Sequence, residues 1–143
     1  MSSEALNKIK LSYRAPRLIE IPGHIKENGS VHFWENRELF PQGVLRCFWI
    51  SGVREGESRG NHAHREESQV IVAVAGKIEI KVDGFGGNVF HFELDKPNVG
   101  LFVPPLNWIS IQFSSGAVLL GLGDRVFSEK DYIRDRDYFG TLQ

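Results

Sequence analysis

Short apolar runs separated by turn-forming residues recur along the chain from about residue 17 onward. The segment Ile78-Glu79-Ile80-Lys81-Val82 alternates apolar and polar side chains at every step, which is the period of a strand with one buried face. The same pattern predicts strands at 18–21, 30–35, 44–50, 70–75, 78–82, 88–94, 100–103, 108–113 and 117–122. Many short strands with almost no helical period predict an all-β fold, either a sandwich or a barrel.

The residues between these runs predict tight connections. Asn28-Gly29 and Asp83-Gly84 are pairs that supply the positive φ angles of a type I′ hairpin turn. Gly76 follows the run 70–75 directly and predicts another tight turn. The fold is therefore expected to be built largely from hairpins.

The two ends of the chain lack a clear strand pattern. Residues 1–16 are polar and end at Pro16, which predicts a flexible or docking N-terminal arm. Residues 124–138 are charged and aromatic without a clean period, which predicts a short helix or a covering loop. The chain of 143 residues suits one hydrophobic core, so we expect an arm at 1–16 and a single domain at 17–143.

The composition is that of an ordinary globular protein, with 41% hydrophobic and 24% charged residues and a formal net charge of −1. This balance gives no electrostatic reason to expect binding to nucleic acid or to a membrane surface. No segment approaches the apolar length of a membrane span, and the N-terminus lacks a signal-peptide core. The single cysteine, Cys47, favours a reducing, cytoplasmic location, and we expect its thiol to be packed in a strand and inert.

The candidate chemistry lies between Arg59 and Gln69, where His62 and His64 stand one residue apart. In a strand this spacing directs both imidazoles to the same face. An apolar, β-branched run follows, which suggests that the pair points into the mouth of a barrel. Such a pair suits either a metal or a proton-transfer site, although two hydrogen-bonded structural histidines are an alternative.

Arg46 interrupts the apolar run 44–50. Its guanidinium either faces a polar cavity or lies on the solvent side, and a structural salt bridge is also possible. Gln69 is a residue that can orient His64.

The spacing around the histidines resembles the first signature of the cupin fold, a double-stranded β-helix jelly roll. Gly56, five residues, His62-Ala63-His64, four residues, Gln69, six residues and Gly76 match it at every interval. Gln69 stands where a metal cupin has Glu.

The second cupin signature would place a histidine shortly after Pro104, and none is present. Two imidazoles and a carboxamide make a poor site for a divalent ion. We therefore expect no metal and no other cofactor, with His91 the only spare histidine in the later strands.

Two further pieces narrow the resemblance. Arg59-Gly60-Asn61-His62-Ala63-His64 and Asp131-Tyr132-Ile133-Arg134 resemble the WxcM-like sugar-nucleotide 3,4-ketoisomerases, which act on dTDP-4-keto-6-deoxyglucose. The resemblance covers about residues 17–139. It implies a cytoplasmic, metal-free, usually homodimeric isomerase that moves a keto group from C4 to C3 through an enediolate. Such enzymes belong to deoxysugar biosynthesis for glycans such as O-antigen or S-layer chains.

The resemblance also implies roles for individual residues. The C3 hydrogen lies α to the C4 ketone, and an imidazole suits its removal near neutral pH. In the family the second histidine of the pair is the favoured base, so His64 takes that role with His62 beside it. Arg59 and Arg46 would stabilise the enediolate or hold the diphosphate. The residues expected to contact the dTDP-linked substrate are Arg46, Gln69, Trp49, Asn107 and Trp108.

The chain departs from the family pattern in two places. The family strand Arg-Val-Tyr-Tyr-Ile reads Arg46-Cys47-Phe48-Trp49-Ile50 here, which removes two phenol groups. The Trp-His that often follows the family's proline is also absent.

A water, His62 or Tyr132 could supply the missing group. Alternatively, the protein acts on a different keto sugar or binds sugar nucleotides without turnover. A metal-dependent cupin and a 3,5-epimerase are less favoured alternatives.

Overall fold

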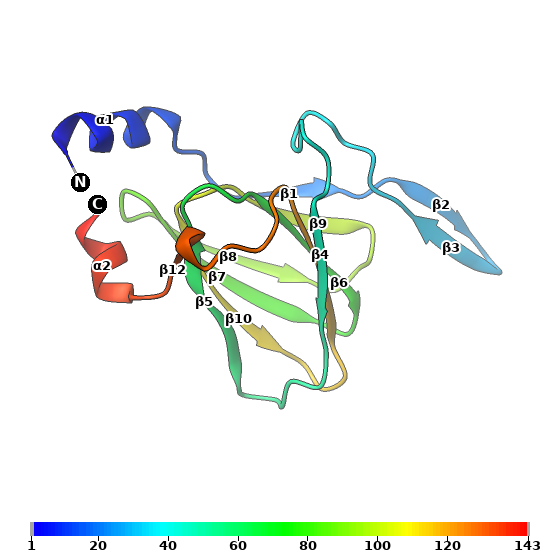
Figure 1. Cartoon of the computed structure of the whole chain (residues 1–143). Coiled ribbons are helices and arrows are strands. Elements are labelled where there is room, and N and C mark those ends of the chain that lie inside the picture. The colour runs from blue at the N-terminus through cyan, green and yellow to red at the C-terminus, as the bar shows by residue number, and fades with distance from the viewer. Residues whose placement is uncertain (1, 143) are drawn as a thin grey trace.

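The computed structural model describes residues 2–142, and β-strands dominate it (Figure 1). The elements are α1 (Ser3–Ser12), β1 (Arg17–Glu20), β2 (Gly23–Lys26), β3 (Gly29–His32), β4 (Arg46–Ile50), β5 (Ser58–His64), β6 (Gln69–Ala75), β7 (Ile78–Gly84), β8 (Val89–Leu94), β9 (Val99–Val103), β10 (Asn107–Phe113), β11 (Val118–Gly123), η1 (Glu129–Asp131), β12 (Tyr132–Ile133) and α2 (Arg136–Thr141). The all-β prediction is confirmed. Neither helix is long and apolar enough to cross a membrane within the described range.

The strands form two five-stranded antiparallel sheets and a separate hairpin. One sheet has the order β1-β9-β6-β11-β4, the other has the order β12-β5-β10-β7-β8, and β2 pairs with β3. Figure 1 shows the β2–β3 hairpin projecting away from the two sheets. The facing side chains of the sheets make the main core, which includes Ile71, Ile80, Leu101, Ile111 and Leu119. This core is the physical outcome of the period-two pattern in the sequence.

Both predicted hairpin turns exist, the first at its expected position, residues 26–29, and the second further along the chain than Asp83-Gly84. Lys26 pairs with Gly29, so Asn28 is the second central residue of its turn, and it does not have a positive φ angle. Strand β7 continues through Gly84, and the chain turns over residues 85–88. A Cβ at Gly84 would lie 2.2 Å from the hydroxyl of Tyr13, so this glycine serves close packing rather than a turn.

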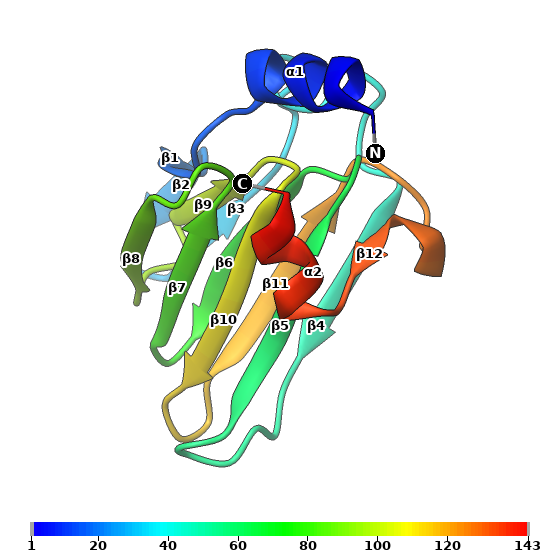
Figure 2. The same ribbon diagram turned by 90° about the vertical axis from the view of Figure 1, so that its left-hand side faces the viewer.

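The N-terminal arm is more ordered than expected, because most of it forms helix α1. The arm is anchored after that helix, where the Tyr13 hydroxyl donates to Asn107 Oδ1 at 2.7 Å and its ring lies over Phe85. At the other end, α2 buries Phe139 against Trp108 and Ile133, and Figure 2 shows this helix lying against the sheet. The expectation for 124–138 is confirmed, since this segment holds η1, β12 and the start of α2.

Gly121 on β11 should be intolerant of a side chain. It faces Phe48 across the β4–β11 pair, and a Cβ there would lie 2.1 Å from the Phe48 ring. Overpacking of this kind costs about 1–3 kcal/mol. We expect Gly121→Ala to lower the free energy of unfolding by that amount in urea denaturation.

The matched control is Gly140→Ala in α2, where the nearest atom to an added Cβ is 3.6 Å away. This change should leave stability equal or slightly raised, since alanine is the better helix former. Equal effects of the two substitutions would contradict the packing argument.

Candidate active site

A cavity of about 290 Å³ lies between the two sheets. Strands β4, β6 and β11 contribute one wall, β5 and β10 contribute the other, and residues 127–134 close one side. Its apolar lining residues include Ile50, Ile71, Ile109, Ile111 and Leu119. Its polar lining residues are Arg46, Arg59, His62, Gln69, Tyr132 and Arg134. An apolar hollow with a few converging polar groups is typical of a small-molecule site.

Strand β5 brings the two imidazoles together, as the His-x-His spacing predicts. The ring centroids of His62 and His64 are 4.9 Å apart. Strand β12 pairs with β5 so that Tyr132 lies opposite His64, with its ring centroid 4.4 Å from that imidazole and 4.9 Å from His62. The family-like segments around residues 59–64 and 131–134 therefore form one cluster in space.

A local irregularity in β5 precedes the pair. The register between β5 and β10 shifts between Ile109 and Ser110, opposite Gly60, and Gly60 and Asn61 both have positive φ angles. A Cβ at Gly60 would lie 3.1 Å from the carbonyl oxygen of Ile109. A bulge of this type redirects side chains. Here it lies directly before His62, whose side chain lines the cavity.

His62 lines the cavity as a neutral imidazole. Its Nδ1 lies 3.0 Å from the carbonyl oxygen of Gly60, and since a carbonyl only accepts, Nδ1 carries the proton. Burial lowers the pKa of His62 to about 4, and the charge of His64 acts in the same direction. Its Nε2 therefore holds a free lone pair near neutral pH, and this buried atom has no hydrogen-bond partner among the described residues.

His64 lies behind His62 and is almost fully buried. Its Nδ1 is 2.9 Å from Asp131 Oδ2. Asp131 also accepts the backbone N–H groups of Glu66 and Glu67. Burial alone would raise the pKa of Asp131, but the bonds from His64 and from these backbone groups outweigh it and hold the pKa below its usual value. Asp131 is thus an ionised partner that fixes the orientation of the imidazole.

The other nitrogen of His64 faces a second carboxyl group. Its Nε2 lies 3.3 Å from Glu67 Oε2 and 3.2 Å from Gln69 Nε2. The Gln69 amide donates to Glu67 Oε2 at 2.7 Å. Arg46 Nη1 is 3.6 Å from the same oxygen and donates to the Tyr132 hydroxyl at 2.7 Å. Polar contacts therefore run without a break from Tyr132 to Asp131.

Three guanidinium groups give the cavity a positive potential. Arg46 lies over the rings of Phe48 and Tyr132. Arg134 is paired with the exposed carboxylate of Glu129, whereas Arg59 has no acidic partner among the described residues. Guanidinium groups bind phosphates in a bidentate manner, so this wall is suited to an anionic ligand.

Three of the expected substrate contacts lie elsewhere. The side chains of β4 alternate, so Arg46 and Phe48 line the cavity while Trp49 lies on the outer face with 71% of its surface exposed. Asn107 is buried and donates to the carbonyls of Pro104 and Arg14.

Trp108 is also buried and packs on Phe139, with ring centroids 5.7 Å apart. Asn107 and Trp108 therefore hold the chain ends in place and do not line the cavity. The Cys47 thiol lies on the outer face of β4 and is exposed, contrary to expectation.

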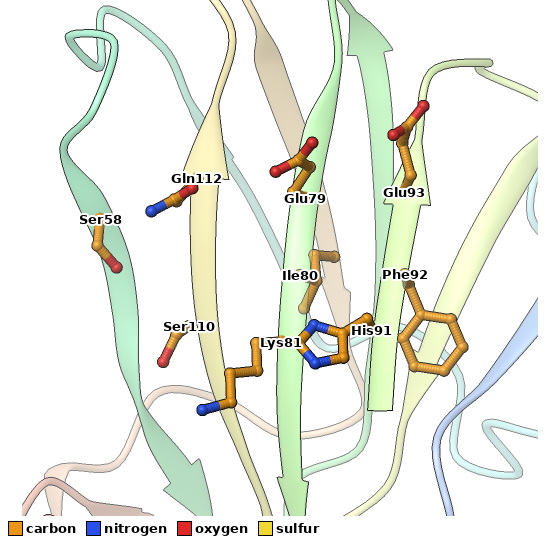
Figure 3. Close-up of a pocket in the computed structure, with 9 residues that line it drawn as sticks. All are labelled: Ser58, Glu79, Ile80, Lys81, His91, Phe92, Glu93, Ser110 and Gln112. Carbon is orange, nitrogen blue, oxygen red and sulfur yellow. The ribbon is translucent and has the colours of Figure 1, made fainter. Parts of the chain in front are cut away.

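The spare histidine of the sequence, His91, does not approach the imidazole pair. It lies on the outer face of the β5-β10-β7-β8 sheet, in an open hollow of about 470 Å³ (Figure 3). Figure 3 shows Glu93 on the same strand as His91, Glu79 on the neighbouring strand β7, and Gln112 on β10 beyond it. This is the solvated face of an antiparallel sheet, with ion pairs such as Lys77–Glu79. Although this hollow is larger, it lacks the converging buried groups of the inner cavity.

One group of three side chains among the described residues could be considered for a metal. Ligand atoms of His64, Glu67 and Asp131 lie within 4.8 Å of one another. However, the two carboxyl groups meet different nitrogens of the same ring, Asp131 at Nδ1 and Glu67 at Nε2. A single ion cannot be bound from both edges, so the group is better described as an imidazole between two carboxyls.

The sequence did not identify several of these site residues. The segment 124–138 predicted only a short helix or a covering loop, but its Asp131 bonds to His64 and its Tyr132 lines the cavity. The resemblance at residues 131–134 named Tyr132 as one candidate for the missing group and gave Asp131 no role. No pattern pointed to Glu67, which lies in a polar loop between two strands.

Comparison with known proteins gives consistent matches. The family model FdtA, described as WxcM-like, C-terminal, matches residues 14–143. A TDP-4-oxo-6-deoxy-α-D-glucose-3,4-oxoisomerase of Aneurinibacillus thermoaerophilus is 33% identical over 124 residues, which cover 86% of this chain and 88% of the relative.

Solved structures agree with these sequence matches. QdtA, a sugar 3,4-ketoisomerase from Thermoanaerobacterium thermosaccharolyticum in complex with TDP, has a TM-score of 0.81 and 30% identity, covering 87% of this chain and 90% of its own. A 3,4-ketoisomerase from Helicobacter canadensis has a TM-score of 0.81 and 32% identity, covering 89% and 96%.

A dTDP-4-dehydrorhamnose 3,5-epimerase from Elizabethkingia anophelis has a TM-score of 0.67 and 15% identity, covering 85% and 75%. At that identity it is similar in fold alone.

The lowered pKa of His62 predicts how stability depends on pH. The folded protein binds the His62 proton only near pH 4, whereas the unfolded chain binds it near 6.5. The free energy of unfolding should therefore fall by on the order of 2–3 kcal/mol as pH drops through this window. His62→Asn removes the titration, so its stability should fall less between pH 7 and pH 4.

Urea denaturation across this pH range measures the difference. His24→Asn, at an exposed position on β2, is the control and should follow the wild-type curve. Parallel curves for wild type and His62→Asn would contradict the prediction.

Proposed function

The chain belongs to the FdtA family of WxcM-like proteins, and from this premise we propose that it isomerises a TDP-linked 4-keto-6-deoxyhexose to the 3-keto sugar. The relative that supports this reaction most directly is named a TDP-4-oxo-6-deoxyglucose 3,4-oxoisomerase. The observation that carries the proposal is the imidazole pair of His62 and His64 facing Tyr132 at a cavity lined by three arginines.

The cavity has a charged surface for the anionic part of the substrate and an apolar surface for its apolar part. Arg59 and Arg134 hold the diphosphate, because guanidinium groups form paired bonds to phosphate oxygens. The 6-deoxy carbon of the sugar lies against the apolar lining of Ile71 and Ile111. This arrangement directs the C3–C4 edge toward the histidines.

His64 is the base that removes the C3 proton. The Asp131 carboxylate holds its Nδ1, which leaves Nε2 to accept the proton once the sugar displaces the Gln69 amide. The C3–H electron pair then forms the C3–C4 double bond of the enediolate, and the proton returns from Nε2 to C4. His62, with a pKa of about 4, is too weak a base for this step, because a catalytic base works best with a pKa near the working pH.

His62 instead serves the sugar oxygens. Its free Nε2 lone pair accepts the proton of the C3 hydroxyl, which must leave that oxygen as the C3 ketone forms. Tyr132 takes the place of the missing strand tyrosines. Its oxygen accepts an N–H from Arg46, so its own proton remains available to donate to the C4 oxygen. At the end of the turnover His62 holds a proton that Tyr132 has lost, and its transfer through solvent restores both groups.

The reaction should appear as deuterium incorporation at C3 of TDP-4-keto-6-deoxyglucose in D₂O, observed by NMR. His64→Asn should slow this exchange by about 10²–10⁴-fold, the usual contribution of a positioned base. His62→Asn should preserve more of the C3 exchange while slowing formation of the 3-keto product. Prior treatment with a chelator should change neither rate.

His24→Asn serves as the matched control and should retain full activity. Abolished exchange in His62→Asn with normal exchange in His64→Asn would reverse the two roles. Saturable TDP binding without exchange would favour the second candidate, a sugar-nucleotide binder, which the loss of a phenol at Phe48 motivates.

We also propose that the protein is a homodimer. The projecting β2–β3 hairpin exposes Ile25 and Val31 by 70% and 55%, and Figure 1 shows it extending beyond the sheets. The register pairs His24 with Val31 and Ile25 with Ser30, so the two apolar side chains lie on opposite faces of the hairpin. Exposed apolar side chains commonly mark an interface, and a second copy of the chain that contacts both faces would cover them.

Light scattering after size exclusion tests this assembly. The wild type should have the mass of a dimer, and Ile25→Asp should have that of a monomer. Lys26→Gln on the same strand is the control and should remain dimeric. A monomeric wild type at micromolar concentration would exclude the proposal.

A further inference from the structure

Glu67 is the one acidic residue among the described positions whose side chain is fully removed from solvent, with 2% exposed. It lies in the loop between β5 and β6. Neither Glu67 nor His64 lines the cavity itself, but Glu67 contacts Arg46 and Gln69, which do. We therefore consider what Glu67 contributes through the groups that it contacts.

Those contacts all belong to the catalytic cluster. Glu67 Oε2 accepts from Gln69 at 2.7 Å and lies 3.3 Å from His64 Nε2. The same oxygen is 3.6 Å from Arg46. The carboxyl group is therefore next to the nitrogen that takes the C3 proton in the proposed reaction.

The surroundings of Glu67 do not suggest a purely structural role. Its Oε1 is buried and has no hydrogen-bond partner among the described residues, although an unsatisfied buried acceptor normally costs stability. The space for this oxygen exists because β11 carries Gly123, where a Cβ would lie 2.5 Å from Oε1. Arg46 contacts only Oε2, so an ion pair with Arg46 leaves Oε1 without a partner among the described residues. A structural ion pair alone therefore does not explain the carboxyl group at this position.

We propose that Glu67 is a positioning residue that acts through His64. Burial raises the pKa of Glu67, and in its ionised form the carboxyl group stabilises the imidazolium that forms when Nε2 receives the C3 proton. Its bond to Gln69 holds that amide beside the imidazole. This role rests on the proposed isomerase function and is specific to the carboxyl at position 67, which neither the family motif nor the sequence pattern identified.

Other charges also face the His64–Glu67 pair. Arg46 lies on the β4 side, Asp131 meets Nδ1, and His62 and Tyr132 flank the ring. Asp124, which accepts from the backbone of Ser68, and Arg134 lie further out. Asp131 acts at the opposite nitrogen, so Glu67 is the negative group on the side where the transferred proton resides.

The substitution Glu67→Gln tests this role, because it keeps the size of the side chain and removes its charge. The acidic limb of the pH profile for C3 exchange should move to lower pH by about one unit. The plateau rate should fall by about three- to tenfold, since a less stabilised imidazolium means a weaker base. Affinity for TDP should remain unchanged, because Glu67 does not line the cavity.

Glu66→Gln is the matched control, since Glu66 is the neighbouring residue and its side chain is exposed. It should alter neither the limb nor the plateau. Glu67→Asp retains the charge and should keep the acidic limb near its wild-type position. An unmoved limb in Glu67→Gln, with rate and TDP affinity reduced together, would assign Glu67 a structural role and overturn the proposal.

A readout without substrate separates this inference from the proposed function. The imidazole resonances of His64, followed by NMR in the free protein, should move at lower pH in Glu67→Gln than in wild type. If the wild type shows no exchange with a TDP-linked keto sugar, the isomerase proposal fails. The effect of Glu67 on the His64 resonances can still be measured in that case. If exchange occurs and the resonances move at the same pH in both proteins, the role of Glu67 is excluded.

Discussion

The hydrogen bonds of Asp131 are the constraint on which the rest of the site depends. One carboxylate accepts from His64 Nδ1 and from the backbone N–H groups of Glu66 and Glu67. These bonds join residues that are more than 60 positions apart in the chain. They fix β12 beside β5, and through it Tyr132 over the imidazoles. A single partly buried acceptor thus holds both the segment that closes the cavity and the ring of His64.

The two histidines have different environments although they leave the same strand one residue apart. Burial keeps His62 neutral by lowering its pKa, and this outweighs the opposite effect of its hydrogen bond to the Gly60 carbonyl. His64 lies between the carboxyl groups of Asp131 and Glu67. These two carboxyl groups come from segments outside β5, so the difference between the histidines does not follow from the His-x-His motif itself.

The sequence predicted what depends on local periodicity. Alternation predicted the strands of an all-β fold, the shared face of the histidines and, as one of two possibilities, the inward direction of Arg46. It could not reveal Glu67 and Asp131, because their roles depend on contacts formed only after distant loops fold together. Trp49 was misplaced because a one-residue step along β4 reverses the face of the sheet, and the resemblance alone did not fix which aromatic faces the cavity. Asn107 and Trp108 were taken for ligand contacts because nothing local showed that α2 and Tyr13 would cover them.

The replacement of the strand tyrosines has a physical consequence for Arg46. Phe48 offers Arg46 only the face of a ring, at 4.9 Å from its centroid, and no oxygen to accept a hydrogen bond. The Arg46 N–H is therefore available to Tyr132, 86 residues away. A phenol at position 48 would compete for that donor and would weaken the link between Arg46 and β12. Gly121 has no side chain, and this leaves room for the Phe48 ring. With Phe48 on the edge strand β4, the phenol oxygen that Arg46 contacts is that of Tyr132 on the covering segment, next to both imidazoles.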